Sequence, residues 1–162
     1  MHDLAAVATQ CRARLEALGI PIRGIRDIEI NKRAMRTWGT CCRNSNGTYS
    51  ITINPKLLDA PLESLETTLY HEFLHAATGC EGHTGAWKQL AEKVNAALGT
   101  HIQRTTSWED KGLDKTTDPT VRYRFVCSRC GAEVIRFRTC TFTKHYTRYR
   151  CGHCGGDFIR KK

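Results

Sequence analysis

The sequence predicts an α+β protein in which helices pack on a small three-stranded sheet, followed by a small separate module. Three observations support this: helical periodicity in three stretches, a hairpin signal between two short alternating segments, and positive charge concentrated near the C-terminus. The 162 residues suffice for one full hydrophobic core and a small satellite, but not for two full domains. We therefore predict a first domain over residues 1–103, a linker over 104–120 and a second module over 121–162.

Three helices are predicted from apolar residues spaced three and four positions apart. The first covers about residues 4–18, the second begins near Pro61 and ends at Gly79, and the third covers about 84–98. The predicted core face of the second helix consists of Leu62, Leu65, Leu69 and Phe73. That of the third consists of Trp87, Leu90, Ala91, Val94 and Leu98.

Three strands are predicted to form the sheet. The first covers residues 25–30, and two more, at about 37–43 and 48–54, flank an Asn-Gly pair typical of a hairpin turn. In the last strand the residues predicted to share one face are Tyr49, Ile51 and Ile53. The polar stretch 104–120 shows no periodicity and is predicted to be the linker, with Trp108 a candidate to pack back on the first domain.

The N-terminal stretch carries charged residues among Ala and Leu, which predicts an amphipathic helix and not a signal peptide. No stretch reaches the roughly 20 apolar residues that cross a bilayer. The expectation is a monomeric protein that is not secreted, has no membrane partner, and is cytoplasmic or associated with a nucleoid or nucleus.

Nine cysteines could form a disulfide framework, but their number is odd and four of them fall in C-x-x-C pairs, as metal ligands do. In a compartment that keeps thiols reduced, metal binding is the better interpretation of these pairs. The remaining cysteines are predicted to be small buried apolar residues: Cys11, Cys41, Cys42, Cys80 and Cys140.

The second predicted helix contains the motif H-E-x-x-H at residues 71–75. Residues four apart lie one above the other on a helix, so His71 and His75 can direct ring nitrogens at one metal ion. Glu72 is displaced round the helix and can act as general base toward a zinc-activated water. This arrangement predicts a catalytic zinc site, against the alternative of two incidental histidines.

A catalytic zinc usually has a third protein ligand. His83 is the favoured candidate, because it follows the helix by a short loop and flanking glycines permit a close approach. Glu81, six residues after His75, is the rival ligand.

This region resembles the SprT-like zinc metalloproteases, the SprT and Spartan type. The matching stretches are H-E-F-L-H at 71–75, G-H-T-G-A-W at 82–87, V-N-A-A-L-G at 94–99, Trp38-Gly39, and I-T-I-N-P-K-L-L at 51–58. The resemblance implies a zincin-like metalloprotease domain, zinc ligands His71, His75 and His83, and Glu72 as the base. It also implies a protein substrate, namely proteins crosslinked or tightly bound to DNA.

Two C-x-x-C-G units, twenty residues apart, predict a zinc ribbon. Two thiolate pairs complete a closed tetrahedral site with no open position, which is typical of structural zinc. The ligands are Cys127, Cys130, Cys151 and Cys154. The sequence therefore predicts two zinc ions per chain, one catalytic and one structural.

The whole net charge of +9 lies in residues 121–162, because residues 1–120 hold 14 basic and 14 acidic residues. The same segment holds seven aromatic residues, and basic side chains with aromatic rings are typical of single-stranded DNA binding. The candidate contacts are Arg129, Arg136, Arg138, Lys144, Arg148 and Arg150, with Arg136 and Arg138 expected on one strand face. The alternative is an aromatic mini-core with a solvated or protein-contacting basic face.

Three functions follow from these patterns. The leading one is a zinc-dependent endopeptidase that cleaves proteins on DNA. A regulatory protease that cuts one repressor is the second. The third is a non-catalytic zinc protein that binds nucleic acid, and Glu72 argues against it because a scaffold needs no base.

Overall fold

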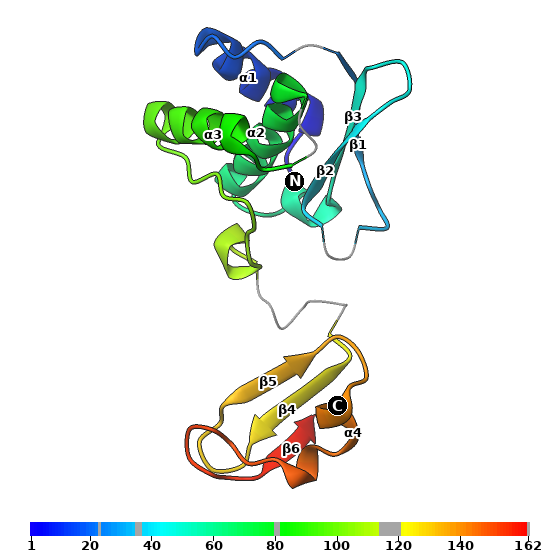
Figure 1. Cartoon of the computed structure of the whole chain (residues 1–162), viewed down its shortest axis with the longest axis vertical. Coiled ribbons are helices and arrows are strands. Elements are labelled where there is room, and N and C mark those ends of the chain that lie inside the picture. The colour runs from blue at the N-terminus through cyan, green and yellow to red at the C-terminus, as the bar shows by residue number, and fades with distance from the viewer. Residues whose placement is uncertain (23, 35–36, 80–81, 114–120, 162) are drawn as a thin grey trace. The chain divides into compact units, whose positions relative to one another are not determined.

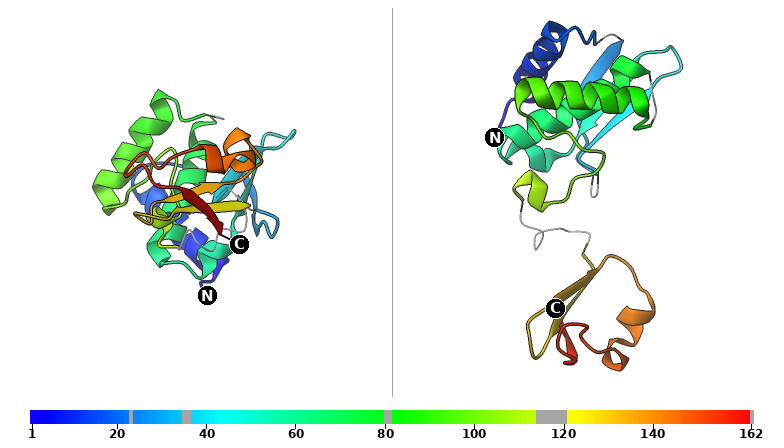
Figure 2. Two further views of the ribbon diagram at one scale, coloured as in Figure 1. Left: turned by 90° about the horizontal axis from the view of Figure 1, so that it is seen from below. Right: turned by 60° about the vertical axis from the view of Figure 1, so that its left-hand side comes forward.

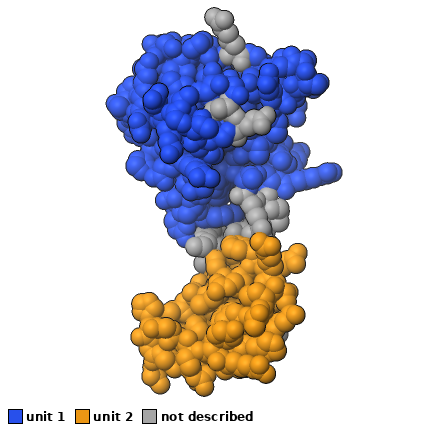
Figure 3. Space-filling model, in the orientation of Figure 1, with its two compact units in different colours: residues 1–115 blue, residues 116–162 orange. Residues whose placement is uncertain are grey.

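The computed structural model describes residues 1–22, 24–34, 37–79, 82–113 and 121–161. The chain divides into two compact units, residues 1–115 and 116–162 (Figure 3). Both contain helices and a small sheet, so the predicted α+β class is confirmed. In the described part of the chain, no helix is both long and apolar enough to cross a membrane.

The described residues of the first unit form three α-helices, three strands and two short 3-10 helices (Figure 1). In chain order they are α1 (Leu4–Ala17), β1 (Ile25–Ile30), β2 (Gly39–Arg43), β3 (Tyr49–Ile53), η1 (Pro55–Leu58), α2 (Leu62–Thr78), α3 (Gly85–Leu98) and η2 (Glu109–Lys111). Asp3 caps α1 by accepting from two backbone N–H groups of the first turn. Gly79 ends α2 in the left-handed conformation, as the sequence predicted.

The sheet has the strand order β1-β3-β2. β1 runs parallel to the central strand β3, and β2 runs antiparallel to it through the predicted hairpin. Ile51 and Ile53 of β3 are fully buried, while Tyr49 is half-buried. The predicted alternation is therefore confirmed for the two isoleucines.

α2 is the central helix of the unit. It contacts α1, α3, β2 and β3, and Figure 1 shows the helices on one side of the sheet. α3 packs on α2, as the right-hand view of Figure 2 shows. Most residues of the two predicted core faces are buried or partly buried: Leu65, Leu69, Phe73, Trp87, Leu90, Ala91, Val94 and Leu98. The prediction for Leu62 is wrong, since it is 42% exposed in the first turn of α2, before the helix enters the core.

Residues 104–113, predicted as the start of the linker, pack on the first unit. The Trp38 indole N–H donates to the Thr106 carbonyl at 3.3 Å, and the Trp38 and Trp108 ring centroids are 5.0 Å apart. Lys111 is 3% exposed. Isolated contacts of this kind leave no periodic pattern in the sequence, and residues 104–113 were therefore predicted to belong to the linker.

The second unit is a three-stranded antiparallel sheet with short helices. Its elements are β4 (Tyr123–Cys127), β5 (Glu133–Arg136), α4 (Thr141–Lys144), η4 (Tyr146–Arg148) and β6 (Phe158–Lys161), in the sheet order β5-β4-β6. Phe125 is fully buried. Five of the seven aromatic residues contact one another: Phe125, Phe142, Tyr146, Tyr149 and Phe158. The half-buried Phe142, Tyr146 and Phe158 therefore form a small core around Phe125, the role that the alternative assigned to the aromatics, whereas Tyr149 is 40% exposed.

Two expectations about single residues are corrected. β5 ends at Arg136, so Arg138 lies beyond the strand and the two arginines do not share a strand face. Of the cysteines predicted to be buried, Cys11 is buried, Cys41 is half-buried, and Cys42 and Cys140 are exposed. Cys42 lies on the outer strand β2, where one strand face is solvated; Cys80 is outside the described residues.

Candidate metal centres

Three histidines of the first unit direct ring nitrogens at one point. His71 and His75 lie one turn apart in α2, with their Nε2 atoms separated by 3.3 Å. His83 lies in the loop before α3, and its Nε2 atom is 2.9 Å from that of His71. The structure thus brings together the three predicted ligands. Glu81, the rival ligand, lies outside the described residues.

The arrangement fits a tetrahedral metal ion. Zinc–nitrogen bonds of roughly 2.0–2.1 Å place two ligand nitrogens about 3.3 Å apart, close to the two measured separations. The His71 Nδ1–H group donates to the Gln103 carbonyl at 2.9 Å, which leaves Nε2 with a free lone pair. Burial and the neighbouring His75 and His83 lower the pKa of His71 to about 4, which favours the neutral imidazole that binds metal.

Trp87 of α3 packs against all three imidazoles. Its ring centroid lies 4.8 Å from that of His71, 5.7 Å from that of His75 and 4.5 Å from that of His83. Trp87 is 2% exposed and limits the rotation of the three rings. The sequence predicted this residue only as part of the core, because helical periodicity carries no information about ring contacts.

Glu72 lies beside this site, buried between α2 and β2. A Cβ atom on Gly39 of β2 would be 2.6 Å from Glu72 Oε1, so the carboxyl group occupies space that only glycine leaves open. Burial raises the pKa of the Glu72 carboxyl to about 8, and the nearby Lys111 ammonium opposes this rise. A carboxyl group tuned in this way is able to exchange a proton near neutral pH.

A pocket of about 250 Å³ opens beside His71 and Glu72. It is lined by residues 37–39, 67, 68, 71, 72, 103–106 and 111. The sequence did not predict the contributions of Gln103, Arg104 and Lys111. Arg104 and Lys111 lie in the polar stretch 104–120, whose one distinctive residue was Trp108, and Gln103 directly precedes it.

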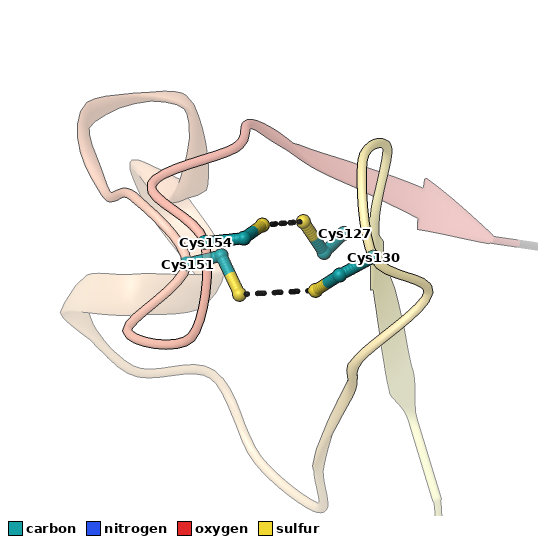
Figure 4. Close-up of side chains that lie close together, drawn as sticks. All are labelled: Cys127, Cys130, Cys151 and Cys154. Atoms are coloured by element: carbon teal, nitrogen blue, oxygen red, sulfur yellow. Dashed lines mark hydrogen bonds between the residues drawn. The ribbon is translucent and has the colours of Figure 1, made fainter.

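In the second unit the four predicted cysteine ligands converge (Figure 4). The Sγ atoms of Cys127 and Cys154 are 3.4 Å apart, and those of Cys130 and Cys151 are 3.6 Å apart. These separations far exceed the disulfide length of about 2.05 Å. They approach the roughly 3.8 Å expected between thiolates that share one zinc ion, so the four residues fit a closed structural site.

The local backbone supports thiolate formation at Cys127. N–H groups of Cys130 and Arg129 donate to the Cys127 sulfur and lower the pKa of that thiol to about 6. A Cβ atom on Gly156 would lie 2.9 Å from Cys127 Sγ and 3.3 Å from Cys154 Sγ. A side chain at Gly156 would therefore crowd two of the four ligands.

All six predicted nucleic-acid contacts are exposed on the second unit. Three of them contact protein groups: Arg129 donates to the Cys154 carbonyl, Arg150 pairs with Asp157, and Arg136 lies over the Phe142 ring. The side chains of the other three form no hydrogen bond or ion pair with any residue that the structure describes: Arg138, Lys144 and Arg148. These three side chains are available to an anionic partner.

The SprT-like family model matches residues 13–108, more than half of the chain. Over 119 residues the chain is 30% identical to protein SprT of Escherichia coli, covering 70% of this chain and 67% of that protein. It is 27% identical over 137 residues to the germ cell nuclear acidic-1 protein of Caenorhabditis elegans, covering 80% of this chain. The chain spans only 24% of that second relative's length.

Among solved structures, the chain is similar to the metallopeptidase zymogen of Pyrococcus abyssi abylysin, with 17% identity and a TM-score of 0.44. The match covers 62% of this chain and all of the other. The family match and the two metal-binding groups support a metalloprotease-type function. By the match over residues 13–108 and the likeness to protein SprT, the chain belongs to the SprT-like family.

Proposed function

We propose that the protein is a zinc-dependent endopeptidase that cleaves proteins bound or crosslinked to DNA. The observation that supports this best is the convergence of three histidine Nε2 atoms beside a pocket that also contains the Glu72 carboxyl. A purely structural metal site needs neither an adjoining pocket nor a buried carboxyl group beside it.

At the first site, His71, His75 and His83 would hold one zinc ion, which lowers the pKa of a water molecule and polarises a peptide carbonyl. Glu72 accepts a proton from the attacking water and later returns it to the leaving amine. Gln103 keeps the proton of His71 on Nδ1, and Trp87 holds the three rings in place. The pocket receives part of the substrate next to these groups.

At the second site, the four cysteines would hold a structural zinc ion that stabilises the ribbon. The ribbon is proposed to bind single-stranded DNA through its exposed basic side chains. Arg138, Lys144 and Arg148 support this role, since no described residue pairs with them. Because most of the clustered aromatic residues pack in the core of this unit and only Tyr149 among them is exposed, phosphate contacts are proposed to dominate over base stacking.

The test uses the full-length zinc-loaded protein, a DNA-binding protein as substrate, and gels run with and without single-stranded DNA. We expect fragments with the wild-type protein, more of them with DNA, and almost none with Glu72→Gln. Equal cleavage with and without DNA would argue against the role of the ribbon. Equal cleavage by Glu72→Gln would argue against the peptidase mechanism.

A further inference from the structure

Lys111 places a buried ammonium group in the first unit with no carboxylate of the described residues at ion-pair distance, although Asp110 and Glu72 act on it from farther away. Its side chain is 3% exposed, and its Nζ atom donates to the Ser64 carbonyl at 3.3 Å and to Thr68 Oγ1 at 2.8 Å. Both acceptors are neutral. The ion pairs of the described residues do not include Lys111.

This arrangement is costly for the fold. Burying a charge destabilises a protein unless a partner of opposite charge and a full set of hydrogen bonds compensate it. An ammonium group has three N–H donors, and Lys111 uses two of them on neutral oxygens. The third N–H group remains for a ligand.

Lys111 lines the same pocket as His71 and Glu72. Among the pocket's described residues Glu72 is the only acid, whereas Lys111 and Arg104 are both basic, and threonine hydroxyls form much of the remaining wall. The volume of about 250 Å³ is below the roughly 300–1,000 Å³ of sites for drug-sized ligands, and it suits one amino-acid side chain.

We propose that this pocket selects a substrate with an acidic side chain, Asp or Glu, close to the scissile bond, and that Lys111 pairs with its carboxylate. The inference rests on the proposed peptidase function and adds a substrate class to it. Burial lowers the pKa of Lys111 to about 8, so the ammonium form still predominates at neutral pH. An entering carboxylate supplies an opposite charge in direct contact with the ammonium, whereas Asp110 and Glu72 act on it only from a longer distance.

The experiment measures kcat/KM of the full-length zinc-loaded protein on a set of otherwise uncharged peptides. Each peptide carries a single Glu, Gln or Lys at one position, and the position is moved residue by residue along the peptide. At one position near the cut, we expect Glu to be preferred over Gln by roughly tenfold or more, and Lys to be the poorest. This comparison needs no variant and is independent of any effect of mutation on folding.

The variant Lys111→Met keeps the length and the apolar stem of the side chain but removes its charge. We expect the ratio of kcat/KM for the Glu peptide over the Gln peptide to fall to about one, a ratio that a general effect of Lys111 on Glu72 would leave unchanged. The matched control is Lys88→Met, at an exposed position of α3, which should keep the preference. Zinc content and thermal unfolding of both variants establish that they are folded.

The outcomes separate the two proposals. Cleavage without a preference for Glu, or a preference that persists in Lys111→Met, overturns the assignment of the pocket but leaves the peptidase function standing. An equal loss of rate on every peptide in folded Lys111→Met also overturns the assignment of the pocket. Lys111 would then affect catalysis for every substrate and not the choice of substrate side chain. If neither the peptides nor a DNA-binding protein is cut, the proposed function fails, and the pocket assignment fails with it.

Discussion

Gly39 in β2 and Glu72 in α2 lie in contact, and the contact exists only because Gly39 has no side chain. A Cβ atom at position 39 would lie 2.6 Å from Oε1 and 2.8 Å from Cγ of Glu72, well inside van der Waals distance. Strand β2 therefore limits the positions that the side chain of Glu72, the proposed catalytic base, can take on the side that faces away from its own helix α2.

Gly39→Ala is expected to displace Glu72 and to lower kcat, because a misplacement of about 1 Å at a reacting group can cost on the order of a hundredfold. Zinc content should stay unchanged, since the three atoms nearest to an added Cβ at position 39 all belong to Glu72 and none to a histidine. The control is Gly85→Ala, where an added Cβ meets nothing within 4 Å. A kcat equal to that of the wild type would show that Glu72 tolerates the shift.

Glu72→Gln keeps the size of the side chain but removes its ability to accept a proton. We expect a loss of roughly a hundredfold or more in kcat, with zinc content and unfolding temperature almost unchanged. Peptide cleavage, metal analysis and calorimetry check the three quantities. Glu92→Gln, at an exposed position of α3, is the matched control and should behave as the wild type does.

The two metal centres are expected to differ in lability. The three-histidine site leaves a position open to solvent and chelators, whereas the four-cysteine site is closed. Metal analysis should find two zinc ions per chain, and one after mild chelation, with peptidase activity lost at the same step. If the untreated protein holds only one zinc ion per chain, one of the two proposed sites does not bind zinc.

Lys111 should make stability depend on pH above neutrality. Its pKa is lowered by burial from 10.5 to about 8, so between these values the unfolded chain binds more protons than the folded one. The free energy of unfolding contributed by this group therefore rises with pH from about 8 to 10.5 and is lowest and constant below that range. Urea unfolding at several pH values should show this rise as a difference between wild type and Lys111→Met. A constant difference would show that the lysine titrates normally.

Charge reversal on the ribbon is expected to weaken DNA binding. Arg138→Glu with Lys144→Glu removes two available cations, which should reduce the slope of log affinity against log salt by roughly 1.4, at about 0.7 per phosphate contact for single strands. Arg33→Glu with Lys88→Glu makes the same charge change on the first unit and is the control. Fluorescence anisotropy with labelled single-stranded DNA measures both slopes. If both pairs have equal effects, net charge alone drives binding.

The sequence by itself determined those features that depend on local spacing. The four-residue step from His71 to His75 sets two imidazoles on one helix face, and the C-x-x-C pairs set thiols at one edge of a metal site. The Asn-Gly pair predicted the hairpin for a similarly local reason, because its turn conformation suits few other residues. Such features need no knowledge of how distant segments pack.

The tertiary structure alone decided the contacts between segments far apart in the chain. The Gln103 carbonyl at His71, the Trp87 ring against three imidazoles and the Gly39 backbone at Glu72 each join elements whose approach leaves no periodic trace in the sequence. Lys111 is the clearest case. In the sequence it stands among polar residues typical of a linker, and only the packing of residues 104–113 on α2 buries its charge beside the proposed catalytic centre. Burial depends on which surfaces meet, and that is settled by the whole fold.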